Sequence, residues 1–376
     1  AIVSRQLTGA DLGSTARKWA GGARGRDQVI AAVANALRKE IRYTGVHFGD
    51  ASIVPWVPKE ALKRGFGDCK DQATLLVGLL RALGIEAHVA LLRTGPGLDL
   101  DPRLPGLEVF DHAIVYIPGS PATWVDPTAR LMRAGALPEQ DLGRQALIAS
   151  PATTALVLTP SGRAADNRTV FAREVFLAKK GEGRVVETVE AWGIPEAEIR
   201  AMFAGLKPDT RDERLRTYVR NEFMAKELGL VTIGDTSDLS RPFRYTLEAR
   251  TCARANTVDT AAAVTMPVGV LLEAIPGELW KQEVAEGETP KVRRNDFVFD
   301  YPFTRELRYR VAPPPGFAPR PLPPREVRSL GTITLTQEVS ADPAGVVTVS
   351  FRLDSGTPRL APAEVESVRS ELGKLA

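Results

Sequence analysis

The chain has 376 residues, of which 44% are hydrophobic and 25% charged, and its formal net charge is +3. These values are ordinary for a globular protein, and the length allows two or three domains with substantial cores. The near balance of basic and acidic residues lacks the basic excess expected of a nucleic-acid-binding protein. The two cysteines, Cys69 and Cys252, form no disulfide framework, and we expect both to be free thiols.

No run of about 18 apolar residues is present, so we expect no membrane span in this chain. No signal peptide is visible either. The sequence starts at Ala1 rather than Met, so we expect a processed or trimmed form. Composition leaves the compartment and the oligomeric state open.

The first predicted elements lie ahead of Cys69. Residues 26–41 carry apolar side chains at helical spacing and predict an amphipathic helix. An extended, proline-interrupted segment follows over residues 42–64, with a short helix near Lys59 to Lys63. The stretch GFGDCKDQATLLVGLLRALGI, residues 65–85, is the most informative part of the chain.

Cys69 is predicted at the start of a buried helix. Asp68 is a good N-cap, and Asp71 falls in the first turn. Leucines then recur at helical spacing until Gly84 ends the helix. Unpaired backbone amides and the helix dipole favour a thiolate at this place, and a thiolate is the reactive form of cysteine.

Two later segments add a histidine and an aspartate. LEVFDHAIVYI, residues 107–117, reads as a strand that carries His112. After a short Pro/Gly turn, TWVDPTA predicts a second strand ending at Asp126, and the two strands are expected to be antiparallel neighbours. Cys69, His112 and Asp126 would then supply a nucleophile, a base and a group that orients the base.

The ordered segments GDCKDQATLL, DHAIVYI and WVDPTA resemble the transglutaminase-like superfamily of papain-fold cysteine enzymes. The resemblance covers roughly residues 25–150 and is closest to the bacterial branch that pairs this core with β-sandwich domains. It implies that Cys69 is the nucleophile, that His112 is the general base and acid, and that Asp126 orients the histidine. It also favours a periplasmic or extracellular location over a cytoplasmic one. Relatives often carry a further β-domain ahead of the core.

Other residues compete for these roles. His47 and His88 are alternative bases, and Asp111 and Asp68 are alternative partners for a histidine. The Cys69 backbone amide is the natural first oxyanion donor. The indole N–H of Trp56 is a candidate for the second, with packing as an equal alternative.

From Thr169 the sequence changes to alternating, strand-like segments. TVFAREVFLA and GRVVETVEAWG predict a hairpin with its turn at Lys180 to Gly183, and a helix is expected from Asp209 to Leu228. We therefore expect an α+β protein: a transglutaminase-like catalytic core over residues 1–162, then a mostly antiparallel β-sandwich-like domain with helical insertions over residues 163–376. The role of this second domain is open.

The expected function is cysteine-dependent acyl chemistry on a peptide or amide, through a thioester. We expect hydrolysis, as in a protease or amidase, rather than cross-linking. The alternative is a non-catalytic scaffold or binding protein. We expect no cofactor and no metal, and a peptide or protein substrate as the partner rather than a nucleic acid.

Overall fold

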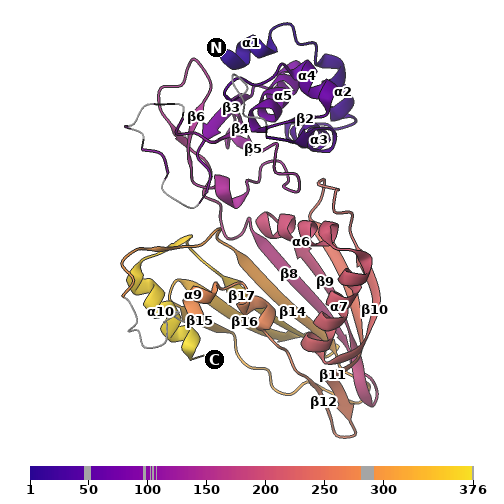
Figure 1. Cartoon of the computed structure of the whole chain (residues 1–376). Helices are drawn as coiled ribbons and strands as arrows, with labels where there is room; N and C mark the ends of the chain where they lie inside the picture. The colour runs from indigo at the N-terminus through magenta and orange to yellow at the C-terminus, as the bar shows by residue number, and fades with distance from the viewer. Residues whose placement is uncertain are drawn as a thin grey trace. The chain divides into compact units, whose positions relative to one another are not determined.

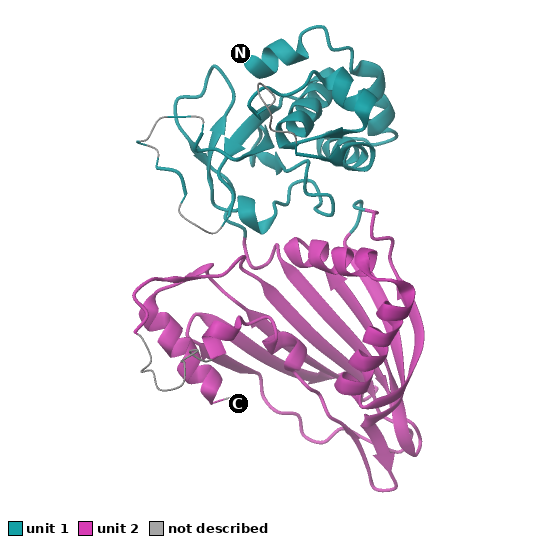
Figure 2. Cartoon of the chain, viewed as in Figure 1, with its two compact units in different colours: residues 1–162, 239–241 teal, residues 163–238, 242–376 magenta. Residues whose placement is uncertain are grey.

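A computed structural model describes residues 1–45, 52–95, 99–101, 103, 106, 108–280 and 292–374. The chain divides into two compact units, residues 1–162 with 239–241, and residues 163–238 with 242–376 (Figure 2). The assignment of residues 1–162 as a catalytic core and 163–376 as a separate β domain stays a prediction. No helix among the described residues is long and apolar enough to cross a bilayer.

Unit 1 combines helices with a small antiparallel sheet (Figure 1). Its helices are α1 (Ile2–Leu7), α2 (Gly13–Ala20), α3 (Arg26–Glu40), α4 (Pro58–Arg64), α5 (Cys69–Ala82) and the short 3₁₀ helix η2 (Glu139–Asp141). Its strands are β1 (Arg42–Tyr43), β2 (Phe66–Gly67), β3 (His88–Leu92), β4 (His112–Ile117), β5 (Thr123–Val125), β6 (Gln145–Ile148) and β7 (Val157–Leu158). The predicted helices around residues 26–41, 59–63 and 69–83 are confirmed.

The sheet of unit 1 has the order β5-β4-β3-β6-β7, and β1 and β2 form a separate parallel pair. Helix α5 is buried along most of its length, and its leucines share one apolar core with α2, α3, β3 and β4. The predicted antiparallel pairing of β4 with β5 is confirmed, with Val115 opposite Val125. This pairing carries His112 and Asp126 to the same part of the sheet.

Helix α5 is fixed at its start and along its back. Asp68 and Asp71 form a capping box, in which each side chain accepts a hydrogen bond from the other residue's backbone N–H. Nine residues along, Gly78 lies against the N-terminal helices. A Cβ there would stand 2.6 Å from Leu12 Cδ1 and 2.8 Å from Leu7 Cδ2, so only glycine fits without a shift.

Unit 2 is built on a large mixed sheet. A nine-stranded sheet has the order β10-β11-β9-β8-β14-β17-β16-β15, with β12 paired to β11, and β13 pairs separately with β18. The strands are β8 (Arg168–Phe176), β9 (Gly181–Ala191), β10 (Ala225–Ile233), β11 (Phe243–Val258), β12 (Ala261–Val264), β13 (Phe297–Val298), β14 (Thr304–Ala312), β15 (Glu326–Leu330), β16 (Ile333–Ala341), β17 (Val347–Asp354) and β18 (Arg359–Leu360). All large-sheet pairings are antiparallel except β8 with β14.

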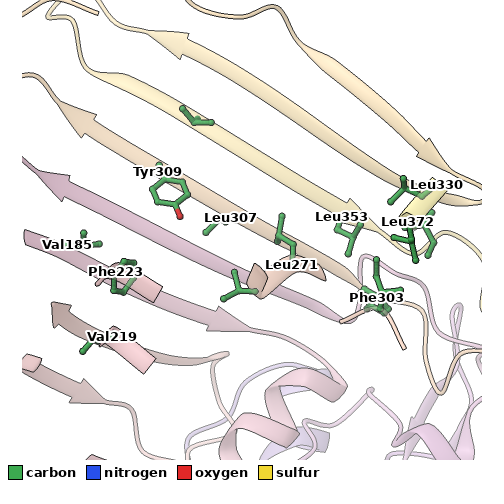
Figure 3. Close-up of a cluster of buried hydrophobic side chains, with 14 of the residues drawn as sticks. Val185, Val219, Phe223, Leu271, Phe303, Leu307, Tyr309, Leu330, Leu353 and Leu372 are labelled. Carbon is green, nitrogen blue, oxygen red and sulfur yellow. The ribbon is translucent and has the colours of Figure 1, made fainter. Parts of the chain in front are cut away.

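Helices cover one face of this sheet. They are α6 (Ile194–Gly205), α7 (Pro208–Phe223), α8 (Gly269–Leu272), α9 (Gly277–Trp280) and α10 (Pro362–Gly373). Leu307 and Tyr309 of β14 point into the same core as Phe223 of α7, Leu271 of α8 and Leu372 of α10 (Figure 3). The predicted α+β class, with a first unit of helices and a small sheet followed by a mostly antiparallel β domain, is confirmed. The layer facing the large sheet is formed largely by helices.

One predicted helix boundary is wrong. We expected a helix from Asp209 to Leu228, but α7 ends at Phe223 and Leu228 lies in β10. Met224 between them has a left-handed backbone with φ 49°, which ends the helix. Residues 225–233 then pair with the long strand β11, and this pairing overrides the helical spacing of the local sequence. The predicted hairpin of β8 and β9 is confirmed, although β9 already begins at Gly181.

Candidate active site

Cys69 is the first residue of α5, directly after the N-cap Asp68. Its side chain is largely buried, with 7% of the residue exposed. The first amides of a helix have no intrahelical acceptor and carry a partial positive charge. The position therefore favours a negative charge on sulfur or on an oxygen bound beside it.

His112 and Asp126 lie together on neighbouring strands. Because Val115 pairs with Val125, Asp126 falls opposite Ile114 and diagonal to His112 on the same face. His112 Nε2 lies 3.3 Å from Asp126 Oδ2, and the side chains are 9% and 1% exposed, respectively. The two groups form a close ion pair whose alignment falls short of a well-directed hydrogen bond.

The electrostatics of this pair favour a charged imidazolium. Burial alone would lower the pKa of His112, but the neighbouring Asp126 carboxylate and the Cys69 side chain together raise it to about 11. For Asp126, burial opposes ionisation, yet contact with His112 and Thr128 holds its pKa below the ordinary value. His112 thus lies between a thiol and a carboxylate, and the arrangement can hold a proton on the ring.

Two residues outside the expected set hold Asp126. The Thr128 backbone N–H and hydroxyl each donate to Asp126 Oδ1 at 2.8 Å. Arg38 of α3 donates to the Asp126 backbone carbonyl at 2.7 Å, and burial lowers the pKa of this arginine to about 10 despite the Asp126 charge. Arg38 is a buried arginine in an otherwise largely apolar set of buried α3 residues. In the sequence, a charged residue next to Leu37 of the predicted apolar face is the signal that could have pointed to this hydrogen bond with Asp126.

Asp141, the last residue of η2, is a further acid at this site that the sequence analysis did not single out. It is 0% exposed, and neither of its carboxyl oxygens has a hydrogen-bond partner among the described residues. Burial and the Asp126 charge, opposed by His112, raise the pKa of Asp141 to about 7. No local pattern marks a single aspartate in the loop sequence PEQDLG, so this contact could not be read from the sequence.

His112, Asp126 and Asp141 also make up the one group of side chains in the described part of the chain with potential metal-ligand atoms close together. One such atom from each lies within 4.8 Å of the others. The imidazole nitrogen that faces Asp126 is engaged with that carboxylate. The ion pair therefore accounts for much of this closeness, and we assign no cation here.

The competing residues lie in other contacts. His47 lies outside the described residues. His88 contacts Glu86 at 2.9 Å and Arg81 at 3.4 Å. Asp111 accepts hydrogen bonds from the backbone and hydroxyl of Thr94, and Asp68 caps α5. Of the candidate bases that the structure describes, His112 is the one whose pKa is raised by Cys69.

Trp56, the second oxyanion candidate, is anchored through its backbone. Its backbone N–H donates to Asp71 Oδ1 at 2.8 Å, so this amide is already used by the capping residue of α5. The guanidinium of Arg64 lies 3.8 Å from the centre of the indole ring. Trp56 as a whole residue is 40% exposed. The oxyanion role of the indole N–H stays a prediction.

A cysteine at the start of a buried helix, packed on an antiparallel sheet that carries a histidine and an aspartate, defines a papain-like α+β core. Residues 13–125 match the sequence profile of the transglutaminase-like superfamily. This range contains Cys69 and His112 and ends one residue before Asp126. Over these residues unit 1 is therefore similar to the core of the transglutaminase-like superfamily.

Comparison with whole proteins adds a likeness of fold. A crystal structure described as that of a "putative protease" from Parabacteroides distasonis matches with a TM-score of 0.54 at 12% sequence identity. The alignment covers 99% of this chain and 55% of that protein, so the chain spans about half the length of its structural relative. No curated protein matches the chain.

Proposed function

We propose that unit 1 is a cysteine enzyme that acts on an amide carbonyl of a peptide or protein through a thioester. The observation that carries this proposal is the contact of His112 with Asp126 in a site where Cys69 and Asp126 both raise the pKa of the imidazole. Nucleophile, base and orienting group in this order are the requirements for covalent acyl transfer by a thiol. The superfamily match over residues 13–125 and the fold likeness to a protein described as a protease support the same class.

In the proposed reaction the Cys69 thiolate attacks the amide carbonyl and forms a C–S bond. The resulting oxyanion is stabilised by the first amides of α5. The imidazolium of His112 then gives its proton to the leaving amine as the C–N bond breaks, which leaves a thioester and a neutral imidazole. His112 next takes a proton from water or from an acceptor amine, which attacks the thioester and releases Cys69.

We infer hydrolysis rather than cross-linking as the outcome. Water is always present as an acceptor, whereas transfer to an amine needs a site that holds the amine. No lysine-binding feature was identified in the sequence. The protease description of the structural relative points in the same direction.

A non-catalytic scaffold is the second candidate, because only 7% of Cys69 is exposed. The chain offers a clean test of thiol reactivity. Cys252 is fully buried, its thiol donates to the Ala249 carbonyl at 3.3 Å, and burial raises its pKa to about 11. Alkylation of the native protein by iodoacetamide should therefore report on Cys69, with Cys69→Ser as the blank.

We expect Cys69 to be alkylated faster than a free peptide thiol at pH 7, and His112→Ala to slow the reaction by at least tenfold. His88→Ala is the matched control and should leave the rate unchanged. An unreactive Cys69 in folded protein would favour the scaffold. Turnover is then tested on unfolded casein with and without dansylcadaverine: new peptide ends indicate hydrolysis, and fluorescence incorporated into the protein indicates transfer.

A further inference from the structure

We propose that Asp141 is a positioning residue of this site, which in its protonated form donates a hydrogen bond to Asp126 Oδ2 and holds that carboxylate behind His112. The inference rests on the proposed function for its catalytic meaning. The contact itself can be tested whether or not the protein is an enzyme.

The geometry leaves Asp126 Oδ2 as the acceptor for Asp141. Asp126 Oδ1 already accepts two hydrogen bonds from Thr128, each at 2.8 Å. Oδ2 lies 3.3 Å from His112 Nε2, and a carboxyl oxygen of Asp141 lies within 4.8 Å of these groups. A carboxylate oxygen can accept from more than one donor, and a protonated Asp141 supplies the second.

The backbone fixes Asp141 in this place. Its N–H donates to the Pro138 carbonyl at 3.0 Å, and its own carbonyl accepts from the Thr159 hydroxyl at 2.6 Å. The side chain is therefore presented by an anchored turn to a fully buried position. A buried carboxyl without a partner is costly, whereas a protonated carboxyl that donates to Asp126 is satisfied.

The surrounding charges decide the protonation state. Asp126 and, more weakly, Asp111 raise the pKa of Asp141, and His112 lowers it. Around Asp126 the other interacting groups are Arg38 and Tyr43. With one imidazolium between two carboxyl groups, a single shared negative charge is the favourable state. Above pH about 7 Asp141 loses its proton, and repulsion between the two carboxylates should weaken the hold on His112.

Nuclear magnetic resonance of ¹⁵N-labelled histidine tests the contact directly. The chain has three histidines, and the His112 signal is identified by its loss in His112→Gln. We expect the wild-type His112 ring signal to shift with a midpoint near pH 7 and the shift to be absent in Asp141→Asn, whose amide donates without titrating. An unchanged shift in Asp141→Asn would overturn the proposal. Loss of the wild-type shift on adding EDTA would also overturn the proposal, because it would show that a bound cation links His112, Asp126 and Asp141.

Alkylation of Cys69 tests the positioning role. We expect the wild-type rate to be lower at pH 8.5 than at pH 7, because ionisation of the thiol alone can only raise or level the rate. Asp141→Asn should lack this fall, and Asp141→Ala should be slower at every pH. Asp27→Asn in α3, where the aspartate side chain is 89% exposed, is the control and should behave as the wild type. Equal profiles for Asp141→Asn and Asp141→Ala would overturn positioning by a hydrogen bond. An unreactive Cys69 with the His112 shift intact would instead reject the enzyme and leave the contact standing.

Discussion

Both units bury ionisable side chains on one face of a sheet, but the buried groups have different kinds of partner in the two units. In unit 2, Arg173 is completely buried and lies 2.6 Å from Glu187 and 2.8 Å from Glu222. Tyr218 donates to Glu187 at 2.8 Å, so the acid has both a cation and a phenol. In unit 1, a single imidazole faces two acids, and among the described residues Asp141 has no hydrogen-bond partner unless it carries a proton.

The Arg173 cluster of unit 2 therefore keeps fixed charges, whereas the His112 cluster of unit 1 contains a group that can gain or lose a proton. Around Arg173 the opposite charges compensate one another, and the pKa of the arginine rises above its ordinary value despite burial. A guanidinium does not release its proton in proteins, so this cluster is suited to structure. Around His112 one group, Asp141, has a pKa raised to about 7, so this cluster can exchange a proton near neutral pH, which is the property that acid–base chemistry needs.

The largest expected effect on stability comes from breaking the unit 2 cluster. Arg173→Ala leaves Glu187 buried without its cation, and we expect a loss of about 3–5 kcal/mol. Calorimetry should show a lower melting transition for unit 2. Arg308→Ala, with half of its side chain exposed on the same sheet, is the control and should cost less than about 1 kcal/mol. Equal losses in the two variants would contradict a special role for Arg173.

The next effect concerns reactivity rather than stability. Asp126→Asn should keep the native circular dichroism spectrum but slow alkylation of Cys69 by at least tenfold. The asparagine amide can donate where the carboxylate accepted, which favours the wrong imidazole tautomer and removes the charge that stabilises imidazolium. Asp111→Asn is matched in chemistry and should keep the wild-type rate. Loss in the Asp111 variant alone would transfer the orienting role to Asp111.

A smaller and pH-dependent effect is expected for Asp141→Asn. An acid whose pKa rises from 3.8 unfolded to about 7 folded holds its proton longer in the folded state. Wild-type stability should therefore fall as the pH rises from about 4 to 7 and level off above it. The asparagine variant avoids this loss, so we expect it to be more stable than the wild type by over about 1 kcal/mol at pH 8.

At pH 4 the two proteins should melt within experimental error of each other. Thermal melts at both values, followed by circular dichroism, measure the difference. A variant that is destabilised equally at pH 4 and pH 8 would show that the carboxylate, not the carboxylic acid, is the form the fold uses.

The smallest effect is expected for His88→Ala. His88 contacts Glu86, whose side chain is 71% exposed, and solvent screens such pairs. We expect less than about 1 kcal/mol of lost stability and an alkylation rate within twofold of wild type. A large drop in rate would return His88 to the list of candidate bases.

Local signals in the sequence predicted the elements that position the site. The cap, the leucine spacing and Gly84 defined α5, and the short turn after His112 predicted the paired strands. Asp141 and Arg38 were missed because their contacts join residues far apart in sequence. For the same reason no local pattern could give the parallel pairing of β8 with β14, or the recruitment of residues 225–233 to β11.

Gly78 has a consequence for how the site can be adjusted. A helix rises about 1.5 Å per residue, so Gly78 lies roughly 13 Å along α5 from Cys69. At this point Leu7 and Leu12 contact the bare backbone of the helix that carries the sulfur. The first twenty residues therefore include side chains that pack against α5 at Gly78. A substitution at Leu7 or Leu12 would therefore act on the helix that carries Cys69 without contacting the sulfur.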